Sequence, residues 1–529
     1  MPVRIERGVS RLWRPTLEGY QFNEVNLNEV KPDTRGVYNV LGKSYVRMDD
    51  EIYGIEKDNN TDSFYLVHPV DSSAYKIKVR HNNKGSWTHE MDSPLQWGRA
   101  KIFKRMGCDA QVLSPQAIDK VMILSNVSDS VLRHVLLEQV SPPAMIVDGV
   151  RRAALIERIE TFVSIMKNGY RRLDADADLQ LRLITQLSGW PADRVLRVVG
   201  NDGVTFREYG HDLLSRIPRV QVTEAQVIHS DLLKVTLDCL TQTQIAQLLG
   251  GEVAGDEQQI RALAKTLGVF AETNKATLFN SIYNETEVIP AYGRLIKKQF
   301  PSLTASVITE LVDNLTPDQL AVVFHQERLP LVVLEEARHY VQALRINRAI
   351  EGFLYDALSN EDTLAVAKKI LPSVPGWPQN LRLVIRDQAS GNVLDTIGNP
   401  SVTYARELHK SGDYYEYSGH GEGAPFRHKS LLRCIFETLS HDEVSALTLP
   451  GSDPYGAFAM NVAKAAIEQR SVTAKALGLQ DIKPWFKSPL RLADDRFGYP
   501  LGGRSGRLLP DSSPQLLKDQ VLELYPMMT

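Results

Sequence analysis

Cysteine is scarce in this chain of 529 residues, which carries three, at Cys108, Cys239 and Cys434. The count is odd, the positions lie far apart, and the sequence has neither a CxxC pair nor a Cys/His cluster. This pattern argues against a disulfide framework and against a structural zinc site. We therefore expect each cysteine to be a small buried apolar residue, and we predict no metal and no other cofactor.

An excess of charge of either sign is also missing. The 61 Lys and Arg residues nearly balance the 64 Asp and Glu residues, which gives a net charge of −3. Proteins that coat nucleic acid normally show a basic excess, so we expect no nucleic-acid partner.

Long apolar runs are absent as well. No window reaches the roughly 18 consecutive apolar residues of a membrane-spanning helix, so we expect no stable membrane span. The first residues, MPVRIERGVSRLWRPTLEGY, lack the apolar core of a secretory signal peptide. We expect either a soluble protein or one that is secreted without a cleaved signal peptide.

The familiar catalytic motifs are not found. The sequence contains no GxxxxGK[ST], no HExxH, no GxSxG and no EF-hand loop. This argues against the common enzyme classes that use these motifs, but it leaves open an enzyme whose catalytic residues are scattered along the chain.

What is present begins with β-type patterning over residues 1–110. Runs rich in Tyr, Val, Ile and Phe alternate with turn signals such as Leu41-Gly42-Lys43 and Asn82-Asn83. Short runs of this kind, spaced by roughly 8–12 residues, are typical of an antiparallel meander or a small barrel.

The pattern changes to helical periodicity over residues 111–375, with a short strand expected at 195–199. Capping boxes, in which a Ser or Thr is followed three residues later by Gln or Glu, mark three helix starts. These pairs are Thr241/Gln244, Thr316/Gln319 and, further along the chain, Ser440/Glu443. A long helical stretch is expected from about Val332 to Leu371, where Pro372, Pro375 and Pro378 end it.

A small β insert is predicted over residues 376–425. LRLVIRD and VLDTIG flank the turn residues ASGN, and DYYEYS is a further strand candidate. Residues 426–529 return to helical patterning and include a Gly/Arg-rich junction. The sequence therefore predicts an α+β fold, predominantly helical, in about three or four domains.

The loop GHGEGAP, residues 419–425, is the first candidate for chemistry. His420, Glu422 and His428 lie close enough in sequence for acid/base work or for metal binding. The alternative is a polar loop between a strand and a helix that starts near Lys429, where glycines supply turn conformations.

The second candidate is RLADDRFGYPLGGRSGRLL, residues 491–509. Arginine side chains bind phosphate through two hydrogen bonds, so these positions form a candidate anion-binding set: Arg491, Arg496, Arg504 and Arg507. However, Asp494 and Asp495 can pair with arginines internally, and Pro510 separates the glycines from the last predicted helix. A phosphate loop places its glycines directly at a helix start, so a structural junction is the alternative.

Several other polar residues are expected to be structural. His68, His81 and His89 fall in the β region without the partners that would complete a metal site. His325 and His339 are expected to be solvated or at the rim of the core. Two basic clusters, Lys101/Lys104/Arg105 and Arg151/Arg152, are expected to be solvated helix faces.

Three stretches, in this order, carry a resemblance to a known family. The first is the run of aromatic and turn phrases between Gly36 and Trp97, which includes GVY, KSYV, VHP and GSW; the others are LQLRLITQLSGWP and IKPWFKSPLRLADDRFGYPLGGRSG. The chain resembles the dermonecrotic-toxin-like domain of large secreted effectors of Gram-negative bacteria. These phrases are not chemical signatures, so they indicate relatives rather than a mechanism.

The resemblance also implies a setting. In many such proteins this region precedes leucine-rich repeats and a ubiquitin ligase domain whose nucleophile is a Cys in a Cys-x-Asp setting. Here Cys108 and Cys239 lie directly beside an Asp, and Cys434 is followed by Ile435 and Phe436. No ligase nucleophile can be assigned, so we expect an upstream module, either naturally short or cut from a longer polypeptide with downstream domains.

Three hypotheses follow. The first is a non-catalytic module of a secreted bacterial toxin or effector of the type III or type VI kind, which serves delivery, binding of an unknown host protein or positioning of a catalytic domain in the host cytoplasm or outside the cell. The second is a toxin enzyme that acts on an anionic or phosphorylated substrate. The third is a membrane-surface binding module, against which the near-neutral charge and the lack of a basic amphipathic helix argue.

Overall fold

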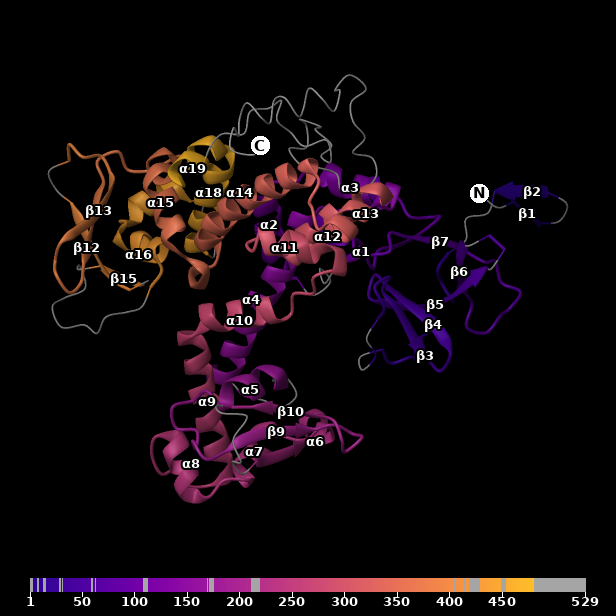
Figure 1. The fold of residues 1–529 in the computed structure, drawn as a ribbon, viewed down its shortest axis with the longest axis horizontal. Coiled ribbons are helices and arrows are strands. Elements are labelled where there is room, and N and C mark those ends of the chain that lie inside the picture. The colour runs from indigo at the N-terminus through magenta and orange to yellow at the C-terminus, as the bar shows by residue number, and fades with distance from the viewer. Residues whose placement is uncertain are drawn as a thin grey trace. The chain divides into compact units, whose positions relative to one another are not determined.

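The computed structural model describes residues 3–6, 9–12, 16–27, 30, 32–58, 60–61, 63–107, 113–168, 170, 176–210, 219–402, 405–412, 414–417, 429–448 and 453–479. These residues form two compact units. Unit 1 comprises described residues of Met1–Ala153 and of Glu287–Thr529, and unit 2 is the continuous stretch Ala154–Thr286. Figure 1 shows the elements of both units, and each unit is described by itself below.

The N-terminal part of unit 1 is an antiparallel meander in the order β3-β4-β5-β6-β7-β8. Each strand pairs with the next one along the chain, as the turn spacing predicts. A separate hairpin pairs β1 (Val3–Glu6) with β2 (Val9–Leu12). The six strands are β3 (Val37–Val40), β4 (Lys43–Met48), β5 (Glu51–Asp58), β6 (Ser63–Val67), β7 (Lys78–His81) and β8 (Trp87–His89).

One face of this meander holds a continuous apolar core. Its buried members are Val37, Val46, Met48, Tyr53, Ile55, Leu66, Val79 and Trp87, joined by Tyr20 and Ile77. On the opposite face Phe22 lies over Gly54, where a Cβ would come within 2.8 Å of its ring. Glycine is thus required in the middle of β5 because the Phe22 ring occupies the space of a side chain.

The helices of unit 1 pack mainly around one long helix, α14 (Leu331–Leu354), which contacts α2, α12, α15 and α18. The other unit 1 helices before it are α1 (Arg99–Arg105), α2 (Pro115–Ser125), α3 (Asp129–Glu138), α11 (Arg294–Gln299), α12 (Ala305–Asp313) and α13 (Pro317–Gln326). Those after it are α15 (Glu361–Ile370), α16 (Leu431–Thr438), α17 (His441–Leu447), α18 (Pro454–Glu468) and α19 (Arg470–Ala476). No helix in the described part of the chain is both long and apolar enough to cross a membrane.

The long helical stretch predicted from about Val332 to Leu371 is divided in the structure. Tyr355 is extended, with φ −135° and ψ 101°, and ends α14. A short 3-10 turn, η5 (Asp356–Leu358), follows, and Asn360 then caps α15 by accepting from the N–H of Thr363. Asn at this position starts a new helix because its side chain replaces a missing backbone acceptor.

A mixed sheet of four strands in the order β13-β12-β14-β15 forms the small insert of unit 1. The predicted hairpin is confirmed as β12 (Arg382–Asp387) antiparallel to β13 (Val393–Gly398). β14 (Arg406–Ser411) was not predicted; it runs parallel to β12 and pairs with β15 (Tyr414–Tyr417). RELHKS has no alternating apolar pattern, and only its Leu408 is fully buried.

Unit 2 combines a small sheet with helices. The sheet order is β10-β9-β11, with β9 (Val195–Val199), β10 (Phe206–Tyr209) and β11 (Arg219–Thr223). Its helices are α5 (Ala177–Ile184), α6 (Glu224–His229), α7 (Leu232–Asp238), α8 (Gln242–Leu249), α9 (Asp256–Thr273) and α10 (Lys275–Glu285). Helix α4 (Ala144–Asn168) begins before the boundary at Ala153 and continues into unit 2.

The predicted fold class is confirmed, because the described residues are mostly helical and carry separate small sheets. The strand at 195–199 and all three capping boxes are also confirmed. The predicted domain boundaries at residues 110, 375 and 425 stay predictions, and residues 110 and 425 lie outside the described part of the chain.

Candidate functional site

The residues that the sequence singled out most strongly lie outside the described part of the chain. They are His420, Glu422, His428, Arg491, Arg496, Arg504 and Arg507. Cys108 lies outside it as well. Their suggested acid/base and anion-binding roles stay predictions, and the site is therefore sought among the described residues.

The three histidines of the meander have separate structural roles. The Nδ1 atom of His68 accepts from the backbone N–H of Asp71 at 2.9 Å, and the His81 ring lies 4.7 Å from the Trp87 ring. His89 is 3.0 Å from Asp92, and burial lowers the pKa of His89 to about 4, so it is neutral at pH 7. Within the described ranges no group of three His, Cys, Asp or Glu side chains is arranged to hold a metal ion.

Two arginines expected on solvated helix faces are instead buried. Arg105 is 3% exposed and contacts Asp49 at 2.8 Å, so that α1 is fastened to the β4–β5 turn. Arg152 is 6% exposed and binds Glu351 through both Nε and Nη2, at 2.8 and 2.6 Å. The expectation was wrong because a charge run in sequence does not show which carboxylate a fold will place opposite it.

The cysteines were expected to be buried, which is confirmed for Cys434 and wrong for Cys239. Cys434 is fully buried, and burial raises the pKa of its thiol to about 12, so it is an inert core residue. Cys239 is exposed at the C-cap of α7.

A polar cluster lies at the start of α16, just after the predicted loop. The Asp356 carboxylate accepts from Ser430 Oγ at 2.5 Å and from the hydroxyl of Tyr455. The guanidinium of Arg433 lies 3.4 Å from the centre of the Tyr455 ring, and its Nε is 3.4 Å from Asp356. Burial, and then the Asp356 charge, raise the pKa of Tyr455, so the phenol keeps its proton.

The strongest candidate surface is one face of the three-stranded sheet in unit 2. Because side chains alternate along a strand, the pairing register assigns each residue to a face. One face carries the buried residues Leu196, Val198, Val220 and Val222 and belongs to the core. The opposite face, called the open face here, carries Arg197, Val199, Phe206, Glu208, Arg219, Gln221 and Thr223. Val195, at the start of β9, lies on the same face and is buried, so the open part of this face is the part toward Phe206.

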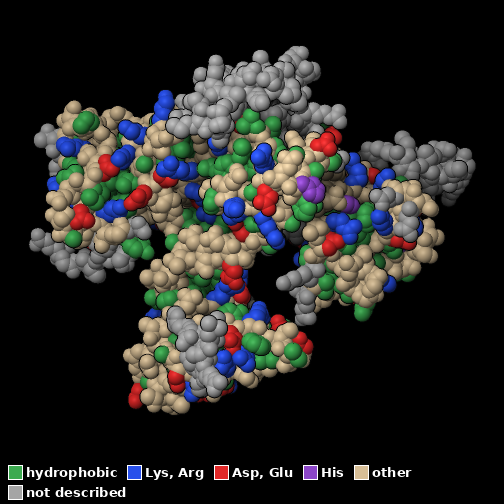
Figure 2. All heavy atoms as spheres, viewed as in Figure 1, with side chains coloured by type: hydrophobic (Ala, Val, Ile, Leu, Met, Phe, Trp, Pro, Cys, Tyr) green, Lys and Arg blue, Asp and Glu red, His purple; other side chains and the backbone are tan. Residues whose placement is uncertain are grey.

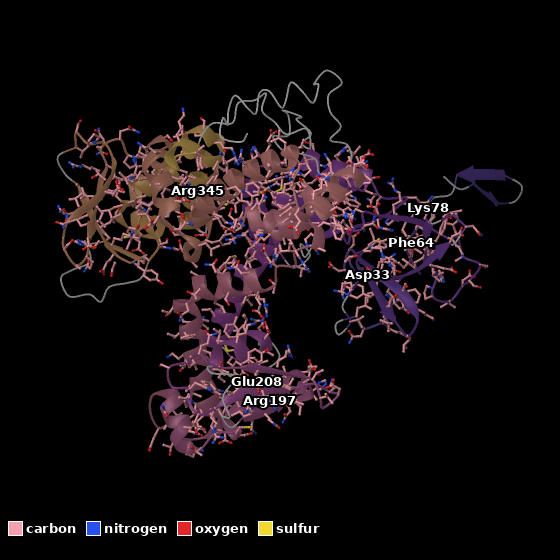
Figure 3. The ribbon with its side chains drawn as sticks, in the orientation of Figure 1. Asp33, Phe64, Lys78, Arg197, Glu208 and Arg345 are labelled. Atoms are coloured by element: carbon pink, nitrogen blue, oxygen red, sulfur yellow. The ribbon has the colours of Figure 1, made fainter. Side chains whose placement is uncertain are left out.

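A carboxylate joins all three strands of the open face. Glu208 Oε1 on β10 accepts from Arg197 Nη2 on β9 at 2.6 Å and from Arg219 Nε on β11 at 2.9 Å. The hydrogen bonds from Arg219 and then Arg197 lower the pKa of Glu208, so it stays ionised. Figure 3 shows Arg197 and Glu208 next to each other on this sheet. The arginines are thus held in fixed positions on the surface.

An exposed aromatic ring completes the open face. Phe206 is 55% exposed, and the Arg197 guanidinium lies 4.3 Å from the centre of its ring. Val204, in the turn before β10, is 80% exposed. Figure 2 shows basic and acidic side chains adjoining hydrophobic ones in this part of unit 2. Leaving a phenylalanine and a valine in water costs free energy that a partner can recover by covering them.

This arrangement is suited to binding rather than to chemistry. A fixed arginine beside an exposed aromatic ring is a combination enriched where proteins meet one another. Glu208, Arg197 and Arg219 already bond to one another, and the lowered pKa of Glu208 makes its carboxylate a weak general base. The open face can recognise a surface that is partly apolar and partly acidic.

The sequence predicts β9 but not the open face. GVTFREYG was not interpreted as a strand, because Phe206 and Tyr209 fall on opposite faces of β10 and the strand is four residues long. The available signal was the turn GNDG followed by Thr-Phe-Arg-Glu-Tyr, in which Asp202 accepts from the N–H groups of Val204 and Thr205. An Asx turn between two short runs is typical of a hairpin.

No protein-family model, no curated protein and no solved structure matches this chain.

Proposed function

We propose that this chain is a non-catalytic binding module of a secreted bacterial toxin or effector, and that unit 2 supplies the surface that contacts a host protein. The family resemblance of the sequence motivates the toxin setting. Secretion without a cleaved signal peptide, and action in the host cytoplasm or outside the cell, belong to the same proposal.

The observation that carries the binding role is the open face. It presents Phe206 with more than half of its side chain in water, beside an arginine that is fixed by Glu208. Fixed, exposed Arg and aromatic side chains lose little conformational entropy on binding, so they contribute strongly to affinity.

The test uses the full chain produced inside host-type eukaryotic cells. We expect the cells to stay viable, and we expect a host protein recovered with the chain to bind the purified chain with micromolar or better affinity. Phe206→Ser should weaken that binding at least tenfold. Phe324→Ser is the matched control, because Phe324 is 66% exposed but lies on α13 in unit 1. Equal binding by the two variants would refute the proposal.

A second candidate function, an enzyme acting on an anionic substrate, is favoured by the cluster at α16. Arg433 is 41% exposed in its side chain, and in the described part of the chain no group pairs with its Nη atoms. Ser430 and Tyr455 both donate to Asp356, so two hydroxyls and a carboxylate are placed beside the Arg433 guanidinium, which is held by Asp356 and by the Tyr455 ring.

The two candidates differ in their effect on cells. If the chain kills host cells and Asp356→Asn abolishes killing while Phe206→Ser does not, the enzyme is the correct function. If the chain is harmless and Asp356→Asn leaves partner binding intact, the binding module stands.

A further inference from the structure

Among the residues that the structure describes, the open face ends at an unpaired sheet edge. β10 pairs with β9 on one side and is the outer strand of the sheet order β10-β9-β11. An edge strand presents backbone N–H and C=O groups that can pair with another extended segment.

The hydrogen-bond pattern shows which groups point outward. The N–H of Gly200 donates to the carbonyl of Thr205 at 2.8 Å, so these two residues form a hydrogen-bonded pair at the start of the hairpin. In an antiparallel ladder such pairs alternate with pairs that do not bond to each other. Arg207 and Tyr209 therefore bond to β9, while the N–H and C=O groups of Phe206 and Glu208 point away from it.

The side chains beside these outward groups favour a particular kind of strand. A segment paired with β10 places alternate side chains on the open face, next to Phe206, and the others on the opposite face, next to Arg207. The Arg207 side chain is 57% exposed and meets Glu224 through one nitrogen at 3.4 Å. In the described part of the chain Glu224 is the carboxylate that meets Arg207, and it meets only one nitrogen, so an acidic residue opposite Arg207 gains an ion pair.

A second copy of β10 is a poorer partner in the register that uses the outward groups of both Phe206 and Glu208 in each copy. Pairing Phe206 of one copy with Glu208 of the other would place the two Arg207 side chains directly opposite each other. Like charges directly opposite each other destabilise a strand pair. The charge pattern therefore favours an acidic segment from another protein.

We infer that β10 binds an extended peptide segment of alternating apolar and acidic residues by strand addition. The apolar residues cover Phe206 on the open face, and the acidic residues pair with Arg207 on the other face. This inference rests on the proposed binding function and adds the partner's conformation and sequence character.

The test uses the full chain and a fluorescent seven-residue peptide that alternates valine and glutamate, with binding followed by fluorescence anisotropy. Backbone methylation of the valine amides blocks antiparallel addition, and methylation of the glutamate amides blocks parallel addition. We expect one of the two methylated peptides to lose at least tenfold in affinity and the other to bind as the parent does. A Val/Lys peptide should also bind at least tenfold more weakly. The inference is overturned if neither methylated peptide loses affinity, or if the Val/Lys peptide binds as tightly as the Val/Glu peptide.

A pair of variants separates backbone pairing from ring contact. Phe206→Ala and Phe206→Pro both remove the ring, but only proline removes the outward N–H, which takes no part in the β9 ladder. We expect Phe206→Pro to bind the peptide at least fivefold more weakly than Phe206→Ala, with similar thermal unfolding. Equal affinities would overturn strand addition. A dimer in sedimentation velocity that Phe206→Pro dissociates would also overturn it, in favour of self-pairing.

The inference and the proposed function can fail separately. If Phe206→Ser loses the host protein but both methylated peptides bind as the parent does, the binding module stands and strand addition is wrong. If the peptide binds as expected but the chain kills cells through the Asp356 cluster, strand addition stands and the proposed function is wrong.

Discussion

Glu335, in the second turn of α14, is a carboxyl group held in the core of unit 1. The residue is 6% exposed, and its Oε1 has no hydrogen-bond partner in the described structure. Burial raises the pKa of Glu335 to about 7, and the charge of Arg338 lowers this pKa by a smaller amount. The carboxyl group is thus protonated in the folded protein at a pH where it is ionised in the unfolded chain.

Whether Glu335 makes the protein more or less stable as the pH rises follows from the protons bound in each state. Between the unfolded pKa near 4.5 and the folded value near 7 the native state binds more protons, so stability falls as the pH rises. We expect about 2–3 kcal/mol less stability at pH 8 than at pH 5 from this group. Glu335→Gln should flatten that dependence in urea unfolding. Parallel curves for wild type and variant would contradict the assignment.

The buried pair Arg152–Glu351 gives a second residue-scale prediction. Arg152→Met leaves the Glu351 carboxylate, which is 2% exposed, with only the more distant Arg348 at 3.7 Å. We expect a loss of about 3 kcal/mol, because an uncompensated buried charge is costly. The double variant Arg152→Met/Glu351→Leu should recover most of the stability lost in Arg152→Met, because no buried charge is then left without a partner. As a control, Arg261→Met breaks the exposed Arg261–Glu257 pair and should change stability by less than about 0.5 kcal/mol.

At the scale of the element, helix starts are encoded locally. Thr241 accepts from the N–H of Gln244 at 3.3 Å, and the Gln244 side chain accepts from the N–H of Thr241 at 3.0 Å. Thr241→Ala should destabilise unit 2 by about 1 kcal/mol, while Thr241→Ser should be nearly neutral. Thermal unfolding of both variants tests this, and an equal loss from alanine and serine would show that the hydroxyl is not the cause.

Elements that depend on neighbouring residues could be predicted from the sequence, whereas elements that depend on residues far away in the chain could not. The three capping boxes and the hairpin of β12 and β13 depend on residues within a few positions of each other, and all were predicted. β14 was not, because RELHKS becomes a strand through pairing with β12 and packing of Leu408. The open face was missed for the same reason, since Glu208 meets Arg219 only after β11 has joined the sheet beside β9.

At the scale of the whole molecule, the two units differ in how many stretches of the sequence form them. Unit 2 is one continuous stretch, whereas unit 1 is assembled from two separated stretches. Leu263→Ala removes a fully buried side chain from α9 in unit 2, at a cost of about 2–5 kcal/mol. Hydrogen exchange should speed up across residues 154–286 and stay unchanged in α14. A uniform increase in both units would show that they unfold together.

The bond between Arg152 and Glu351 joins residues 199 positions apart in the chain. A ribosome adding about 5–20 residues per second needs roughly 10–40 seconds to supply the second partner after the first. During that time Arg152 and the apolar side chains of α2 have no native neighbours from α14, while the whole of unit 2 is made. We expect nascent chains stalled after residue 340, with residue 286 outside the ribosome, to show protease-resistant unit 2 and protease-sensitive α2, and the reverse order would contradict this folding sequence.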